Sequence, residues 1–318
     1  MFAADRLTLG VFFPIEAFAG DRPAMVDQIE LARRAERARV AALWIRDVPL
    51  RDPSFGDVGQ VYDPWVWLGY VAGATRSIAL ATGAIVLPVR HVLHVAKAAA
   101  SVDRLTGGRL VLGVATGDRP SEFPAFNRGF EERGEVFREA VSILGRVWRE
   151  DAPVVDSPLA RLSGQAIVPK PTASGVPILV AGRAQQTLEW IARSSDGWIT
   201  YPRPGEVQAD IVQLWRRAVA REAADAFKPF AQSLYIDLVS DRTAAPTPIH
   251  LGYRLGIVAL NDMLAQLEDA GVNHVVLNLK YGSRPAADVL EDLATHVVPR
   301  FPAQTTAIES APTKTITV

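Results

Sequence analysis

Residues 78–117 read IALATGAIVLPVRHVLHVAKAAASVDRLTGGRLVLGVATG. Two apolar runs, 78–87 and 109–115, are typical of buried strands, and the stretch 91–105 between them has the periodicity of a helix. Because parallel strands are joined by a crossover that is usually a helix, this segment predicts a strand–helix–strand unit of a parallel sheet.

The same alternation continues along the chain. Further strands are predicted at 7–13, 41–45, 177–182, 197–201, 233–239 and 274–280, and further helices at 24–39, 64–75, 132–149, 184–195, 206–224, 261–270 and 286–299. Eight strands that alternate with eight helices predict a (β/α)8 TIM barrel. A doubly wound open sheet is the rival, but no glycine-rich turn follows the first strand.

Local signals refine this prediction. Asp63 and Pro64 predict a helix N-terminus, and Asn261 and Gly271 are expected to cap and end a later helix. The segments 150–176 and 240–256 are longer than usual connections and predict insertions in the loops of one domain over 1–302. A flexible C-terminal tail is expected over 303–318.

Composition excludes several classes of function. With 34 basic and 35 acidic residues and no long basic run, nucleic acid and membrane surfaces are not expected partners. The absence of cysteine excludes disulfides and thiolate chemistry and fits a cytoplasmic protein. The first 20 residues lack a basic leader region and predict a strand, not a signal peptide.

Charged side chains gather after the predicted strands, where a TIM barrel places its active site. They are Arg46, Asp47, Arg90, Asp118, Arg119, Arg183, Arg203, Asp241 and Lys280. The strand interiors carry almost none, and this asymmetry favours an enzyme over a purely structural barrel.

Two long runs carry a family resemblance. Residues 80–120, which end in DRLTGGRLVLGVATGDRP, resemble the signature of the bacterial-luciferase-like flavin oxidoreductases. Residues 176–203, VPILVAGRAQQTLEWIARSSDGWITYPR, are similar to the fifth and sixth βα units of that family. The resemblance implies a monooxygenase that uses O2 and reduced FMN, supplied by a separate flavin reductase, to oxidise a small organic substrate. The loop at 47–65 resembles an uncharacterised subgroup.

The resemblance also implies where the cofactor lies. The flavin ring is expected against Thr82, Gly83 and Ala84, with a cis peptide between Gly83 and Ala84. Thr116, Gly117, Arg46 and Tyr201, which follow neighbouring strands, would complete the ring site. For Gly83, the alternative is that it only relieves crowding inside the barrel.

The phosphate of the cofactor is expected at Gly182 and Arg183. A strand ends there, and a helix is predicted to begin at residue 184, so free N–H groups and the helix dipole would favour an anion. Gln186 is expected to point back from the first turn of that helix.

Two carboxylates are candidate catalytic groups. Asp47 occupies the place where the resembled family often has a histidine, so it is expected either to accept a proton or to pair with Arg46 or Arg51. Asp118 is expected near the flavin pyrimidine edge or the substrate, together with Arg119 and Glu122, although turn chemistry alone also explains an aspartate there.

His91 is expected to cap the next helix. It lies one helical turn before His94, but five histidines without cysteine predict no metal site.

Three alternatives stay open. A deazaflavin would transfer hydride without oxygen, with Arg183, Arg203 and Lys280 available for its longer acidic tail. A non-catalytic flavin-binding barrel would explain the missing histidines, and a metal-dependent hydrolase lacks ligands.

A homodimer is expected from the resemblance. It would form through residues 64–105, where Trp65, Trp67, Leu68 and Val71 exceed the apolar content that one helix face needs.

Overall fold

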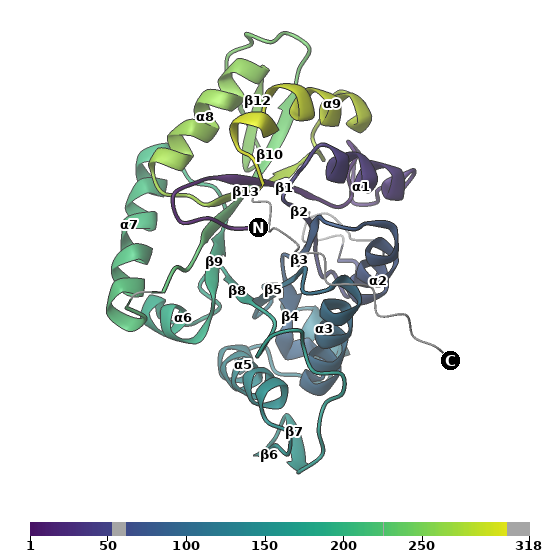
Figure 1. The fold of residues 1–318 in the computed structure, drawn as a ribbon, viewed down its shortest axis with the longest axis vertical. Helices are drawn as coiled ribbons and strands as arrows, with labels where there is room; N and C mark the ends of the chain where they lie inside the picture. Colours follow the sequence, from purple (N-terminus) through teal and green to yellow (C-terminus); the bar gives the residue numbers. More distant parts are fainter. Residues whose placement is uncertain (53–61, 225, 304–318) are drawn as a thin grey trace, which may run out of the picture.

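The protein is a closed parallel barrel in a computed structural model that describes residues 1–52, 62–224 and 226–303. Its strands, in barrel order, are β1 (Thr8–Phe12), β2 (Ala42–Ile45), β3 (Ala79–Thr82), β5 (Leu110–Ala115), β8 (Ile178–Ala181), β9 (Gly197–Thr200), β10 (Phe230–Leu238) and β13 (His274–Asn278). Because β13 pairs with both β1 and β10, the ring closes (Figure 1). The predicted (β/α)8 barrel is confirmed. Of the expected tail over 303–318, residues 304–318 lie outside the described residues.

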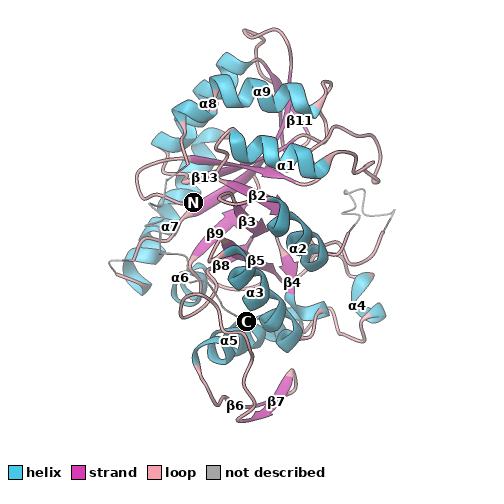
Figure 2. Ribbon diagram, turned by 45° about the vertical axis from the view of Figure 1, so that its right-hand side comes forward, coloured by secondary structure: helices cyan, strands magenta, loops and turns pink. Residues whose placement is uncertain are grey.

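Helices surround this ring (Figure 2). The main ones are α1 (Gln28–Arg37), α2 (Pro64–Ala74), α3 (Val92–Thr106), α5 (Arg133–Arg149), α6 (Leu188–Ser194), α7 (Gly205–Glu222), α8 (Ile257–Asp269) and α9 (Ala286–His296), and α4 (Glu122–Ala125) is a single turn. Short 3-10 turns lie at Leu87–Val89 and Val298–Arg300. The Asp63 carboxylate accepts from the N–H groups of Trp65 and Val66, which confirms the predicted cap of α2.

The predicted cap at Asn261 is wrong. Helix α8 begins four residues earlier, because Ile257 and Leu260 are buried and extend its apolar face. Asn261 lies inside the helix, where its side-chain amide donates to the carbonyls of Ile257 and His296.

Both long connections contain strands that the sequence did not reveal. The first forms an antiparallel hairpin of β6 (Val154–Ser157) and β7 (Ala160–Ser163), which lies at one end of the molecule in Figure 1. In the second, β11 (Thr247–Ile249) pairs with β12 (Gly252–Leu255), and β12 extends the sheet beside β10. The predicted strand 78–87 is interrupted after Thr82, and its second part is β4 (Ile85–Val86).

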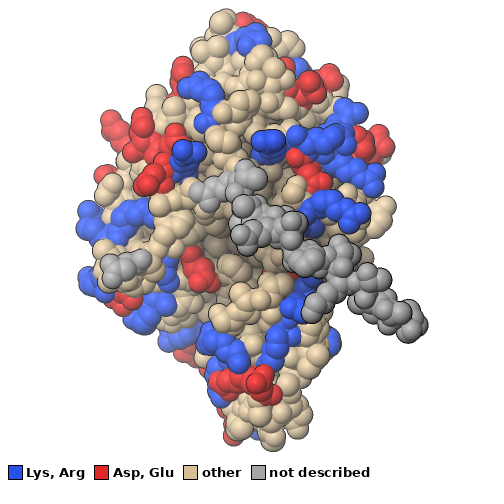
Figure 3. Space-filling model, in the orientation of Figure 1, with Lys and Arg blue, Asp and Glu red and all other residues tan. Residues whose placement is uncertain are grey.

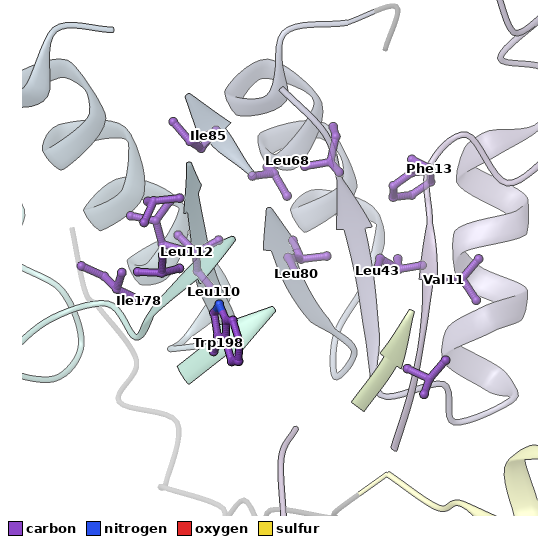
Figure 4. Close-up of a cluster of buried hydrophobic side chains, with 14 of the residues drawn as sticks. Val11, Phe13, Leu43, Leu68, Leu80, Ile85, Leu110, Leu112, Ile178 and Trp198 are labelled. Carbon is purple, nitrogen blue, oxygen red and sulfur yellow. The ribbon is translucent and has the colours of Figure 1, made fainter. Parts of the chain in front are cut away.

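Alternation along the strands divides the core into two layers. One layer lies between the strands and the helices and includes Leu43, Leu80 and Leu112 together with Leu68 of α2 (Figure 4). The other fills the barrel and consists of Phe12, Ala42, Trp44, Ala81, Val111, Leu179, Ile199, Ala231 and Val276. Strand residues of one parity therefore face the helices, and those of the other face the barrel interior.

The barrel interior is sealed at the end where the strands begin. Trp44 Nε1 donates to His274 Nε2 over 3.0 Å, and His274 Nδ1 lies 2.8 Å from the Thr8 hydroxyl. A Cβ atom on Gly10 would lie only 2.6 Å from the His274 ring, so this position has room only for glycine. Complete burial lowers the pKa of His274 to about 3, which keeps the imidazole neutral.

On the face of the molecule that Figure 3 shows, basic and acidic side chains are interspersed. Within the described part of the chain, no helix is both long and apolar enough to span a bilayer.

Candidate functional site

A cavity of about 300 Å³ lies where the barrel strands end. It is lined by Phe12, Arg46, Asp47, Val48, Gly83, Ala84, Val86, Ala115, Thr116, Gly117, Asp118, Arg119, Glu122, Ala181, Gly182, Arg183, Ala184, Ile199, Thr200, Tyr201, Ser233, Tyr235 and Asn278. Ten of the twelve predicted site residues are in this lining; Thr82 and Gln186 are not.

Gly83 lies between the cavity and the packed interior of the barrel. A Cβ atom there would be 3.1 Å from the rings of both Phe12 and Trp44. The Gly83–Ala84 peptide bond is cis, as the family resemblance implies. Gly83 therefore relieves crowding below while it exposes backbone to the cavity above, so both readings of this glycine are compatible with its position.

Asp47 is held by Arg90. The Arg90 guanidinium donates to both carboxylate oxygens over 2.7 Å, and the Val86 N–H donates to one of them over 3.1 Å. Arg90 also donates to Asp63 over 3.0 Å. Burial disfavours the charge on Arg90, but these carboxylates raise its pKa.

The sequence did not identify Arg90 as the partner of Asp47, and Arg51 instead pairs with Asp21 over 2.5 Å. A proton-accepting role for Asp47 stays a prediction, but its carboxylate already accepts three hydrogen bonds.

Arg119 and Glu122 together hold the loop after β2. Arg119 Nη1 donates to the Leu50 carbonyl over 3.4 Å, while the Leu50 N–H donates to the Glu122 carboxylate. Burial raises the pKa of Glu122, attraction to Arg119 opposes this, and the charges of Asp47 and Asp118 add to the rise. Asp118 itself is exposed at the cavity edge.

The predicted helix start at residue 184 is wrong. Helix α6 begins at Leu188 and is capped by Thr187, because Ala184 and Gln185 adopt left-handed φ angles of 46° and 55°. The N–H of Gly182 donates to the Ile199 carbonyl, and that of Gln186 to the Arg183 carbonyl. A phosphate at this turn would therefore meet the Arg183 side chain and a left-handed turn, and not the N-terminus of a helix that begins at residue 184.

Two predicted residues point away from the cavity. The Gln186 amide is buried against α5, where it donates to the Gly134 carbonyl and accepts from Arg138. Thr82 lies on the helix-facing parity of β3, and its hydroxyl donates to the Gly113 carbonyl over 2.8 Å. The assignment of either to the cofactor stays a prediction that this geometry does not favour.

Sequence reasoning missed four polar residues of the cavity, Thr200 at the end of β9 and, on β10 and β13, Ser233, Tyr235 and Asn278. The last three share the inward parity of Ala231 and Val276, so the alternation along β10 and β13 could have identified them. The Ser233 hydroxyl is buried, and no described residue forms a hydrogen bond with its oxygen. Space is also open beside Gly182, where no atom lies within 4 Å of a hypothetical Cβ. The cavity therefore fits a polar ligand.

His91 has the role that its position predicted. It is the N-cap of α3, and its Nδ1 accepts from the Leu93 N–H over 3.3 Å. Within the described ranges, no group of three or more His, Asp or Glu side chains is arranged to hold a metal ion.

A family model described as luciferase-like monooxygenase matches residues 7–246, which is most of the chain. The chain therefore belongs to the luciferase-like monooxygenase family.

Individual relatives fall into several groups. An uncharacterised protein of Mycobacterium tuberculosis is 34% identical over 157 residues, which cover 49% of this chain and 55% of that protein. The 4-hydroxyprotoasukamycin monooxygenase of Streptomyces nodosus subsp. asukaensis is 26% identical over 68% of this chain and 59% of its own length. An F420-dependent hydroxymycolic acid dehydrogenase of Mycobacterium tuberculosis is 30% identical over 61% of this chain and 53% of its own. The chain thus spans a little over half the length of the curated relatives it matches.

Among solved structures, an F420-dependent secondary alcohol dehydrogenase superimposes with a TM-score of 0.75. The match covers 92% of this chain and 98% of the other at 18% identity, so it supports the fold alone.

Proposed function

We propose that the protein is a flavin-dependent oxidoreductase, a monooxygenase that uses reduced FMN and O2 to oxidise a small organic substrate. The observation that carries this proposal is the Ser233 hydroxyl, which has no partner among the described residues and lies in the cavity that collects ten predicted site residues. A buried polar group without a partner costs about 1–3 kcal/mol, and a ligand that supplies the partner recovers that cost.

Different cavity residues would bind different parts of such a cofactor. Gly83 and Ala84, supported from below by Phe12 and Trp44, offer a close backbone approach for a flat ring. Arg183, after β8, offers a cation for the phosphate, and Ser233 offers a hydrogen bond from β10, across the ring of strands from β3. The bound flavin would supply the redox chemistry, while the chain orients it and excludes water.

Binding of FMN and of riboflavin, which lacks the phosphate, tests this assignment. We expect the protein to bind FMN more tightly than riboflavin, as measured by quenching of flavin fluorescence. Arg183→Ala is expected to remove most of that difference. Arg161→Ala, on the exposed β6–β7 hairpin, is the matched control and is expected to retain it. Absence of binding of either flavin by the folded protein would contradict the proposal.

A deazaflavin-dependent hydride transfer is the second candidate. It is favoured by the 30% identity to an F420-dependent dehydrogenase. Arg183 and Lys280 lie after β8 and β13, and Arg203 follows β9, so basic groups are available for an acidic tail. Titration of the same protein with F420 decides between the two, since tighter binding of F420 than of FMN would favour this candidate. Binding of either cofactor without turnover of a broad substrate panel would favour the non-catalytic alternative.

We also propose that the protein is a homodimer through α2 and α3. Of the residues that suggested this, Trp67, Leu68 and Val71 are buried within the subunit. The exposed large apolar side chains of these two helices are instead Val66 and Tyr70 of α2 and Leu105 of α3, which are 72%, 63% and 75% exposed. Light scattering should give twice the chain mass, and Val66→Glu should reduce it to one chain mass.

A further inference from the structure

Glu122 is a cavity residue that the sequence analysis left without a role of its own. It begins α4, its side chain is only 3% exposed, and it contributes to the cavity wall. Its carboxylate accepts one backbone hydrogen bond, from Leu50. Its cationic neighbour is Arg119, whose Nη1 lies 3.5 Å from Glu122 Oε1, at the limit of a hydrogen bond.

The surrounding charges leave this carboxylate poorly compensated. Asp47, from the end of β2, is fully engaged by Arg90, while Asp118 precedes Glu122 in the same loop. The other cations of the cavity wall are Arg46 and Arg183, beyond β2 and β8. Burial and the charges of Asp47 and Asp118 favour the protonated form of this carboxyl, whereas Arg119 and the Leu50 N–H favour the ionised form, and burial is the largest of these effects.

We propose that Glu122 is a proton-carrying acid of the cavity that donates its proton to a substrate oxygen on which negative charge develops. This inference rests on the function proposed above. The Oε–H bond of Glu122 breaks as the O–H bond of the product forms, and the electron pair stays on the carboxylate. Arg119 then balances the new charge, and solvent at the open end of the cavity returns the proton.

Infrared spectroscopy tests the protonation directly and needs no substrate. At pH 6, the folded protein is expected to show the carbonyl stretch of a buried carboxylic acid, which shifts in D2O. Glu122→Gln, which preserves shape but cannot titrate, is expected to remove this band. Glu122→Asp is expected to move the band without removing it, and Glu139→Gln on the exposed face of α5 is expected to leave it unchanged.

Flavin binding is measured on the same samples, which separates this inference from the proposed function. A protein that binds FMN but shows no band sensitive to position 122 would overturn the role of Glu122 alone. A band sensitive to position 122 without binding of FMN or F420 would overturn the proposed function and the donor role with it. With binding and band both present, Glu122→Gln is expected to slow turnover of an accepted substrate by about 10²-fold or more. Unchanged turnover and an unchanged pH profile would overturn the donor role.

Discussion

The two ends of the barrel interior are built from the same strands but differ in how their polar groups are satisfied. At the closed end, the polar side-chain atoms of Thr8, Trp44 and His274 pair with one another or with backbone. At the open end, the hydroxyl of Ser233 has no partner among the described residues, and Glu122 Oε1 lies 3.5 Å from its cationic partner Arg119. The polar groups of the closed end therefore stabilise the fold, whereas those of the open end are available to bind a ligand.

Trp44→Ala should have the largest effect on stability. It removes a fully buried ring and the indole N–H that donates to His274. We expect a loss of about 3–5 kcal/mol in the free energy of unfolding, measured by urea denaturation. Val154→Ala, at an exposed position of β6, should change it by less than about 0.5 kcal/mol. A loss below about 1 kcal/mol for Trp44→Ala would show that the closed end does not depend on this packing.

Arg90→Ala tests the ion pair between Arg90 and Asp47 at the open end. It would leave the Asp47 side chain, which is fully buried, without its cation. Removing one partner of a buried ion pair costs about 3–5 kcal/mol. Because Arg90 is partly exposed, we expect a loss of about 3 kcal/mol in the free energy of unfolding. Arg37→Ala removes an exposed ion pair with Glu30 and should cost at most about 1 kcal/mol. Equal effects of the two substitutions would contradict the assigned role of Arg90.

Acid should lower the free energy of unfolding through protonation of His274 at the closed end. Its pKa is about 3 in the folded protein and near 6.5 when the chain unfolds, so the unfolded state binds more protons between these values. The stabilisation is complete above pH 6.5 and is lost as the pH falls toward 3, by about 1.4 kcal/mol per pH unit. In urea denaturation between pH 6 and 4, His274→Gln should lose stability less steeply than the wild type. Parallel curves would refute the assignment.

Ser233→Ala should produce the smallest effect, with opposite signs in two measurements. Without ligand, the free energy of unfolding should stay unchanged or rise slightly, because an unpaired buried hydroxyl is removed. Flavin affinity should fall about fivefold, which corresponds to a hydrogen bond of about 1 kcal/mol. Thr243→Ala, at an exposed position, is the control and should leave flavin affinity unchanged. A clear loss of stability for Ser233→Ala without any change in affinity would mean that this hydroxyl serves the fold.

The barrel could be predicted because its signals are periodic and local. Apolar strands, amphipathic helices and the Asp63 cap are all readable within a few residues of sequence. The start of α6 was not predicted because neither Ala184 nor Gln185, which form the left-handed turn, is a glycine that would indicate such a turn. Thr187 is a typical N-cap residue and could have indicated the start of the helix.

Much of the cavity was predicted because it lies where the strands end. The inward parity of β10 also contained Ser233, and the outward parity of β3 placed Thr82 elsewhere, so a stricter use of alternation would have improved both assignments. The pairing of Asp47 with Arg90 spans 43 residues and depends on how two loops meet, which no local pattern encodes.

Arg90 also has a consequence for how the protein tolerates change. The Arg90 guanidinium donates to Asp47, at the end of β2, and to Asp63, at the start of α2. One side chain therefore holds together the two ends of the connection between these elements. The entropy of closing a loop grows only slowly, by about 0.6 kcal/mol for each doubling of its length. The length and sequence of the segment between the two aspartates could therefore change while the end of β2 and the start of α2 stay in place.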